Sequence, residues 1–171
     1  DRVAQSAPVS KATLYKYFDS KNDLLGAVIN ELCGSLWQTM EDAPIDSEGI
    51  EHNLKKIASA FVDLIFSNEG LAIYQLVVAE CSDFPELGKL VHETGPRRAL
   101  SQLEQYLNRI NHNEQVHITD VIFAADSFFS LLKGDLHFQC LLGIAPAPSV
   151  EKKKEHINQV VAIYMQGFLY D

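Results

Sequence analysis

Residues 9–21 of this chain read Val9-Ser10-Lys11-Ala12-Thr13-Leu14-Tyr15-Lys16-Tyr17-Phe18-Asp19-Ser20-Lys21. Ser10 can cap a helix, and Leu14 and Phe18 then lie four residues apart on one side, which suits burial against neighbouring helices. The opposite side carries cations, a hydroxyl and phenols that can contact phosphates and base edges: Lys11, Thr13, Tyr15, Lys16 and Tyr17. The stretch therefore predicts a short helix that docks on DNA.

A turn into a second helix follows at Asp19-Ser20-Lys21-Asn22-Asp23. Ser20 is the expected N-cap, and Asp23 stands three residues later, where it completes a capping box. The N-terminus of this helix, with Lys21 beside it, is a natural site for a phosphate group.

These residues resemble the helix-turn-helix of the TetR family of transcriptional regulators, which commonly reads A-G-V-S-x-x-T-L-Y-x-Y-F and continues into a polar turn, S-K and an acidic capping residue. The departure is Pro8, where the family usually has Gly. The resemblance implies that Lys11 to Phe18 is the recognition helix and that Asp1 to Ser6 is the end of the preceding helix. It also implies a first helix, and the start of a second, that have no counterpart in this chain.

The same resemblance assigns the DNA contacts. It implies that Lys11, Ala12 and Lys16 contact base edges, with Lys11 reading a guanine and Ala12 a thymine methyl group. It places Thr13, Tyr15, Tyr17 and Lys21 on phosphates, with Ser10 at the start of the recognition helix. The competing interpretation is an ordinary amphipathic surface helix, which the length of the match and the turn chemistry disfavour.

Composition describes a globular protein with a strong charge asymmetry. The chain has 171 residues, is 47% hydrophobic and carries a formal net charge of −9. Residues 1–30 hold four cations against three anions, so this segment is +1 and the rest is −10. Because an acidic body is repelled by DNA, only the N-terminal segment is expected to face phosphates. No apolar run approaches the ~20 residues of a membrane span and no signal peptide is evident, so we expect a cytoplasmic protein without a membrane partner.

Sites for metals, cofactors and catalysis are not indicated. The three cysteines, Cys33, Cys81 and Cys140, stand singly in apolar segments, which predicts buried reduced thiols. The six histidines lack the spacing of a metal site. Because no nucleophile elbow, phosphate loop or nucleotide fingerprint appears either, we expect no metal, no cofactor and no enzymatic activity.

The body reads as helical throughout, so the predicted fold class is all-α. A long helix is expected over 21–41, ended by Pro44, with further helices over 50–64 and 71–81 that should both be core. Pro85 should open the next helix, and Gly95-Pro96 should kink or break it before a helix over 97–109. A helix over 119–142 has apolar residues on more than one side and a weak point at Gly134-Asp135, and Ser149 should start the last helix.

Scattered segments of the body are similar to the AefR-like type of TetR C-terminal domain: Tyr74 to Glu80, Phe84 to Leu87, Gly95-Pro96, Lys133 to Leu136 and Leu141 to Gly143. This resemblance implies a homodimer built on the last two long helices, with a ligand cavity inside each body. We therefore divide the chain into a partial DNA-binding domain, residues 1–30, and a regulatory domain, residues 31–171.

Residues on helices that should face one another are candidates for the ligand pocket: Phe61, Ile65, Tyr74, Val77, Cys81, Phe84, Leu103, Phe123, Asp126 and Ser127. Any one of these aromatics is more often plain core than cavity lining, and Asp126 could equally be solvated or serve the dimer. Residues expected in the dimer interface, a four-helix contact across a two-fold axis, are Phe128, Leu132, Ile157, Val161, Tyr164 and Phe168.

Together these features predict a bacterial transcriptional repressor, a homodimer on a pseudo-palindromic operator in double-stranded DNA, that a small and largely apolar effector releases. Alternatives are a regulator that binds DNA independently of any ligand and has a solid core, an all-α enzyme that uses the body cavity, and a dimeric protein that binds only a protein partner.

Overall fold

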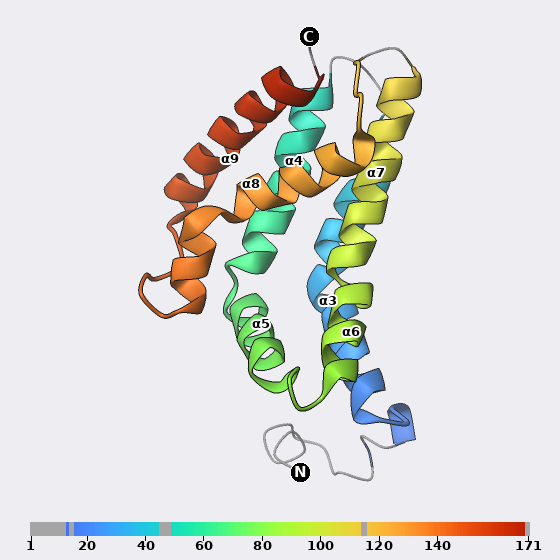
Figure 1. Ribbon diagram of the computed structural model, residues 1–171, viewed down its shortest axis with the longest axis vertical. Helices are drawn as coiled ribbons and strands as arrows, with labels where there is room; N and C mark the ends of the chain where they lie inside the picture. The colour runs from blue at the N-terminus through green and yellow to red at the C-terminus, as the bar shows by residue number, and fades with distance from the viewer. Residues whose placement is uncertain (1–12, 14–15, 45–48, 114–115, 170–171) are drawn as a thin grey trace.

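The computed structural model describes residues 13, 16–44, 49–113 and 116–169. Regular secondary structure in these residues is entirely helical, which confirms the predicted all-α class (Figure 1). The helices are α3 (Lys21–Glu41), α4 (Ile50–Ile65), α5 (Asn68–Glu80), α6 (Pro85–Thr94), α7 (Pro96–His112), α8 (Val121–Leu141) and α9 (Val150–Tyr164), followed by a short π-helix, η2 (Met165–Leu169).

Short polar side chains set the starts of most helices, because they accept the main-chain N–H groups that the first turn leaves unpaired. The hydroxyl of Ser20 accepts from the N–H of Asp23 at 3.1 Å, which confirms the predicted cap of α3. Ser67, Asp120 and Ser149 cap α5, α8 and α9 in the same way. Proline occupies the first turn of α6 and of α7, so Gly95-Pro96 separates two helices, as expected.

The hydrophobic core fills one end of the molecule, where α4 packs against α3, α8 and α9, and α7 packs against α8 (Figure 1). Most of the fully buried large side chains come from these helices, for example Leu54 and Ile57 of α4 and Tyr106 and Leu107 of α7. Tyr164 of α9 donates a hydrogen bond to the carbonyl of Ala124 in α8 at 3.0 Å. Burial therefore costs this hydroxyl little, because its proton has a partner.

Helix α3 runs from the end of the molecule near the N-terminus toward the core (Figure 1). Its buried residues follow a helical spacing: Ile29, Cys33, Leu36, Trp37 and Met40. The helix is continuous across residues 30 and 31, where we expected a domain boundary. The segment that leads out of the DNA-binding motif thus continues into the body within a single helix.

Helices α5 and α6 contain no buried residues, although α5 is almost wholly apolar. The expectation that the 71–81 segment is core is therefore wrong. Tyr74, Leu76 and Val78 are each about half exposed or more. The physical reason is that a cavity borders the inner side of α5, so Leu71 and Ile73 are only partly buried against the core.

Helix α8 breaks where the sequence indicated a weak point. Gly134 has φ 54° and ψ −170°, and the segment beyond it turns away from the first part of the helix (Figure 1). Near this break, the ring of His156 in α9 donates to the carbonyl of Leu132 at 3.0 Å.

The three cysteines are free thiols. Cys33 and Cys140 are buried, as predicted, whereas Cys81 is only partly buried. No single helix of the described residues is long and apolar enough to span a bilayer; the pair α4 and α5 meets both criteria together but is bent by 63°.

Candidate functional site

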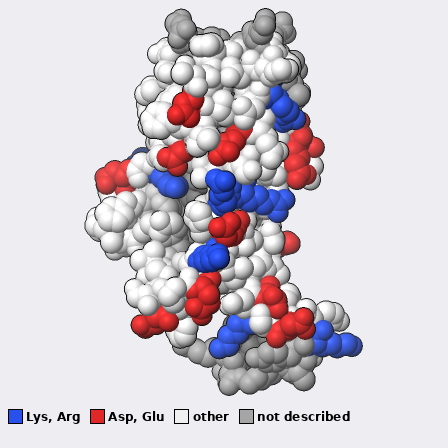
Figure 2. All heavy atoms as spheres, turned by 45° about the vertical axis from the view of Figure 1, so that its right-hand side comes forward, with Lys and Arg blue, Asp and Glu red and all other residues white. Residues whose placement is uncertain are grey.

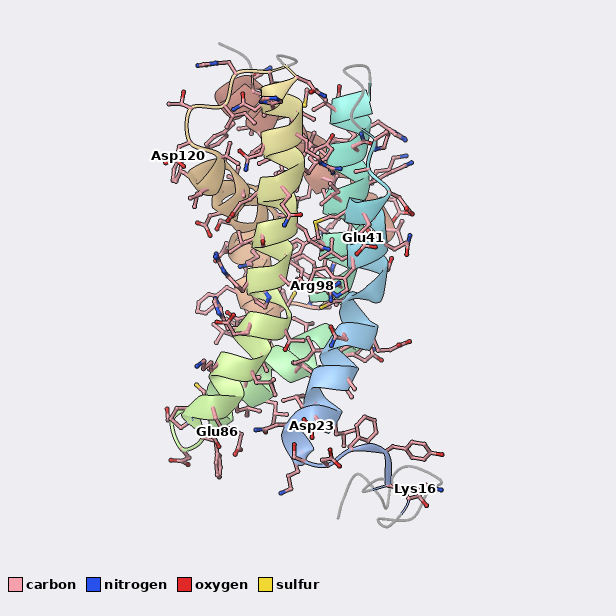
Figure 3. All side chains as sticks on the ribbon, turned by 90° about the vertical axis from the view of Figure 1, so that its right-hand side faces the viewer. Lys16, Asp23, Glu41, Glu86, Arg98 and Asp120 are labelled. Carbon is pink, nitrogen blue, oxygen red and sulfur yellow. The ribbon has the colours of Figure 1, made fainter. Side chains whose placement is uncertain are left out.

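Part of the predicted DNA-binding surface lies within the described residues. Thr13, Lys16, Tyr17 and Lys21 are all exposed, and Lys21 is the first residue of α3. The phenol of Tyr17 is 73% exposed, which is unusual for a large aromatic side chain. Figure 3 shows Lys16 and Asp23 at the end of the molecule from which α3 begins. Ser10, Lys11, Ala12 and Tyr15 lie outside the described residues.

Charge on the body does not offer a second DNA-binding surface in the view of Figure 2. Acidic side chains are interleaved there with lysines and arginines instead of leaving one continuous basic patch. A duplex needs a cluster of unopposed cations to displace its counterions. Compared with the face drawn in Figure 2, the exposed residues before α3 are the better candidates for phosphate contacts.

A cavity of about 310 Å³ lies between α3, the end of α4, α5, α6 and the start of α7. Most of its wall is apolar: Ile29, Leu32, Leu64, Ile65, Ile73, Val77, Val78 and Val91. Glycines and a proline at the helix ends complete it: Gly70, Gly88, Gly95 and Pro96. Since the exposed Tyr74 and Val78 also line it, the cavity opens to the surface beside α5.

Gly70 holds α5 close to the end of α4. A Cβ atom at this position would lie 2.2 Å from the carbonyl oxygen of Leu64, so no other residue fits without moving the first turn of α5. Ser67 joins the two helices, because its hydroxyl donates to the Leu64 carbonyl at 2.7 Å and accepts from the Gly70 N–H at 2.9 Å. Leu64 and Gly70 both line the cavity, so this tightly held corner forms part of its wall.

Polar groups in the wall are few: Cys33, Tyr74, His92 and His137. Burial raises the pKa of the Cys33 thiol to about 11, although the Arg98 guanidinium opposes this effect. The thiol is therefore protonated at neutral pH and unreactive. The side chain of His92 is mostly exposed at the rim, so His137 is the deeply placed polar group.

His137 follows the break of α8 and is only 5% exposed. Its ring meets those of Phe66 and Tyr74 edge to face, with centroids 5.5 and 5.7 Å away. Burial lowers the pKa of His137, the charge of Lys133 lowers it further, and a hydrogen bond to the main chain of Ile65 opposes both. The imidazole is therefore neutral near pH 7.

The structure places the predicted pocket residues in three different environments. Ile65, Tyr74 and Val77 line the cavity. Phe61 and Leu103 are in the core, where Phe61 packs on Phe129 with centroids 4.6 Å apart. The others lie elsewhere: Cys81 and Phe84 at the turn between α5 and α6, and Phe123, Asp126 and Ser127 on the first part of α8. Their contact with a ligand stays a prediction.

Sequence reasoning missed the contributions of α3 and of His137. Ile29 and Cys33 share one side of α3 at a spacing of four, which indicates burial but not what they face. His137 had no distinguishing spacing, since only the break at Gly134 turns it toward α5. No group of three or more histidine, cysteine or acidic side chains within the described ranges lies close enough to hold a metal ion.

Five of the residues predicted for the dimer interface are buried within the protomer and Phe168 is partly buried, so their contact with a partner stays a prediction. Phe128, Leu132, Ile157, Val161 and Tyr164 are buried, and Phe168 stacks on Tyr164 with centroids 5.0 Å apart. The same helices carry a second apolar side that faces outward, which includes Ile122, Phe123 and Ile163, each at least 60% exposed. The sequence pattern indicated two apolar sides on the 119–142 helix, but it could not tell the inner one from the outer one.

Two family models match separate parts of the chain. The family described as AefR-like transcriptional repressor, C-terminal domain, matches residues 52–168, and the family described as bacterial regulatory proteins, tetR family, matches residues 1–28. No curated protein sequence matches the chain.

Solved structures of three regulators share the fold. The flavonoid-responsive regulator FrrA is 28% identical, with a TM-score of 0.72, over 98% of this chain and 84% of that one. A protein from Mesorhizobium loti MAFF303099, described as a TetR-family transcriptional regulator, is 21% identical, with a TM-score of 0.81 over the same shares. A TetR transcriptional regulator from Agrobacterium tumefaciens is 24% identical, with a TM-score of 0.74, over 97% of this chain and 81% of that one.

Proposed function

Because the chain belongs to the TetR family of transcriptional regulators, with an AefR-like C-terminal domain, we propose that it is a repressor that a small, largely apolar molecule releases from its operator. The repressor is a homodimer that acts on double-stranded DNA in the cytoplasm. The molecule that releases it occupies the cavity of about 310 Å³ in the body.

The observation that carries this proposal is that α3 connects the ligand cavity with the residues proposed to bind DNA. Ile29, Leu32 and Cys33 form part of the cavity wall, and the same uninterrupted helix begins at Lys21 beside the exposed Lys16 and Tyr17. At about 1.5 Å per residue, Ile29 lies only about 12 Å along the helix from Lys21. A ligand that pushes on Ile29 therefore acts directly on the element that positions the DNA-binding residues.

Release follows from unequal affinity for two conformers. In a dimer on a pseudo-palindromic site, the two recognition helices enter successive major grooves about 34–36 Å apart. A ligand that binds better when α3 is tilted shifts the population toward conformers whose heads no longer match this spacing. Typical couplings of this kind change DNA affinity by about 5- to 150-fold.

The cavity is suited to an uncharged ligand of modest size. Its volume is at the lower end of the range of about 300–1,000 Å³ that small-molecule sites occupy. The similarity to FrrA, a flavonoid-responsive regulator, supports flat aromatic molecules as the first class to test. A regulator with a solid core is disfavoured by the presence of the cavity itself.

An enzymatic use of the cavity has little support. The family models that match the chain describe transcriptional regulators, and most of the cavity wall is apolar. We therefore assign the cavity to binding.

The DNA-binding half of the proposal is tested by titrating the full-length protein on its own upstream intergenic DNA across a salt series. Tight binding with a steep salt slope and two protected half-sites is expected. Lys16→Ala with Tyr17→Phe should abolish operator binding and leave the dimer intact by light scattering. This assignment would be overturned if the double variant still bound the operator. It would also be overturned if the parent protein did not bind the operator.

The proposal that a ligand in the cavity releases the operator is tested by substituting a larger side chain for one that lines the cavity. Val77→Phe places extra volume in the cavity and should mimic a bound ligand, which lowers operator affinity by about 5- to 150-fold. Leu76→Phe is the matched control, because Leu76 is the neighbouring residue on α5, is half exposed and does not line the cavity. Equal operator affinity of the two folded variants would contradict release through the cavity.

A further inference from the structure

We propose that the cavity selects apolar molecules that carry a hydroxyl group, and that the ring of His137 is the specificity-determining group that accepts the hydroxyl's hydrogen bond. This inference rests on the proposed ligand function and names the chemistry of that ligand. It comes from the position of His137 in the wall and from the contacts that surround its ring.

Three elements fix the His137 ring at the inner side of the cavity. The break of α8 at Gly134 redirects the helix so that His137 meets the end of α4 and the side of α5. Phe66, just after α4, and Tyr74 of α5 flank the ring edge to face. A ring that is held between two aromatic side chains has little rotational freedom, so its nitrogens keep fixed directions.

The main chain of α4 determines whether the His137 ring donates a hydrogen bond to a ligand or accepts one. Ile65 is the last residue of α4, where carbonyl groups lack the partner that a longer helix would provide. The main chain of Ile65 acts on the ring as a hydrogen-bond acceptor does, because it raises the pKa of His137. In a neutral imidazole the second nitrogen carries no proton and can only accept. No other hydrogen bond to the ring occurs among the described residues.

An apolar cavity with one acceptor favours a ligand with one donor. Lys133 and burial both keep the imidazole neutral, which preserves the acceptor near pH 7. A ligand without an O–H group displaces water from the unprotonated nitrogen of His137 and leaves that nitrogen without a hydrogen bond. A ligand hydroxyl replaces the bond that the water made. The expected preference is about 3- to 10-fold in Kd, the range of one net hydrogen bond.

The other polar groups of the wall are less suited to this role. Tyr74 is about half exposed and can reach water, and the side chain of His92 is mostly exposed. The Cys33 thiol is protonated and a weak hydrogen-bonding group. Among the described lining residues, only His137 combines deep burial with a strong acceptor.

The test compares three probes that share one aromatic frame: 2-naphthol, 2-methoxynaphthalene and naphthalene. Their Kd values are measured by isothermal titration calorimetry on the full-length protein and on three variants. His137→Phe keeps a ring of similar size without an acceptor. His137→Gln can still donate to the Ile65 carbonyl and accept from a ligand. His92→Phe changes the other imidazole of the same wall.

The parent protein should bind 2-naphthol about 3- to 10-fold more tightly than both other probes, although naphthalene is the more apolar. The preference should disappear in His137→Phe and persist in His137→Gln and His92→Phe, with thermal denaturation showing that each variant is folded. Equal affinity for the three probes, or a preference that survives in folded His137→Phe, overturns this inference and leaves the proposed function standing. Failure of all three probes to bind the parent protein counts against the cavity as a ligand site and overturns both.

Discussion

The conformation of Gly134 sets the direction of the second part of α8. With φ 54° and ψ −170°, the residue lies in a region of backbone space that is essentially restricted to glycine. Space is not the constraint, because an added Cβ would meet only the His156 ring, at 3.9 Å. The requirement for glycine is therefore one of backbone strain.

Gly134→Ala should lower the free energy of unfolding by about 1–3 kcal/mol, the cost of holding a side chain in this region. Chemical denaturation measures the change. Gly34→Ala is the control, because Gly34 lies inside α3 with no atom within 4 Å of an added Cβ. It should raise stability by about 0.5–1 kcal/mol. If both substitutions changed the free energy of unfolding in the same direction, strain at Gly134 would be refuted.

The burial of His137 predicts a specific dependence of stability on acid. Its pKa is lowered below the ordinary 6.5 in the folded state, so the unfolded chain binds the proton more readily. The contribution of His137 to stability is complete above pH 6.5 and is lost as pH falls from there through the lowered pKa.

Urea denaturation at about pH 7.5 and about pH 5.5 should therefore show a smaller loss of stability in His137→Gln than in the parent protein. His52→Gln, a change at an exposed histidine of α4, should lose as much stability between the two pH values as the parent protein does. An unchanged loss in His137→Gln would show that another group dominates the acid response.

At the scale of elements, one arginine links the DNA-proximal helix to the body. Arg98 of α7 lies over the ring of Trp37 in α3, 4.6 Å from its centroid, and reaches toward Glu41, with the closest charged atoms 4.0 Å apart (Figure 3). Its guanidinium also donates to Asn30 at 3.4 Å. The ion pair is largely exposed and contributes little, so the stacking on Trp37 is the stronger contact.

Arg98→Ala should destabilise the fold by about 0.5–2 kcal/mol, because it removes the cation from the Trp37 ring. Arg97→Ala removes the same charge from an exposed neighbour that has no ion pair among the described residues, and should change stability by less than about 0.5 kcal/mol. Equal effects measured by thermal and chemical denaturation would indicate that net charge, not the α3–α7 contact, is responsible.

At the scale of the whole molecule, the outward apolar side of α8 and α9 is the surface that a second protomer would cover. Phe123 is 60% exposed and Ile163 is 62% exposed, and Phe123 lies against Phe168 with centroids 5.8 Å apart. Exposed apolar side chains that gather on two adjacent helices mark an interaction surface.

Phe123→Glu with Ile163→Glu should convert the proposed dimer to a folded monomer, as measured by light scattering and circular dichroism, because the charges cannot be buried in an apolar contact. Leu76→Glu, on the exposed side of α5, should leave the dimer intact. In contrast, Val161→Glu in the protomer interior should unfold the chain. A dimer that persists in the double variant would place the interface elsewhere.

The sequence by itself was sufficient for the features that depend on neighbours along the chain. The all-α class, the cap at Ser20, the separation of helices at Gly95-Pro96 and the weak point at Gly134 were predicted and are confirmed. The TetR family was also recognised from contiguous residues of the DNA-binding motif. The physical reason is that capping, proline geometry and glycine conformations are decided by bonds between residues a few positions apart.

Only the tertiary structure decided which apolar side of each helix is covered, and by what. Helix α5 was expected in the core and instead borders a cavity, while Phe128 and Tyr164 point inward and Phe123 and Ile163 remain outside. His137 acquires its burial, which lowers its pKa, and its place in the wall from contacts with Phe66 and with Tyr74 of α5, which are distant in sequence. Burial depends on which segments folding brings together. The periodicity of a sequence indicates that one side of a helix is apolar, but it does not indicate which element covers that side.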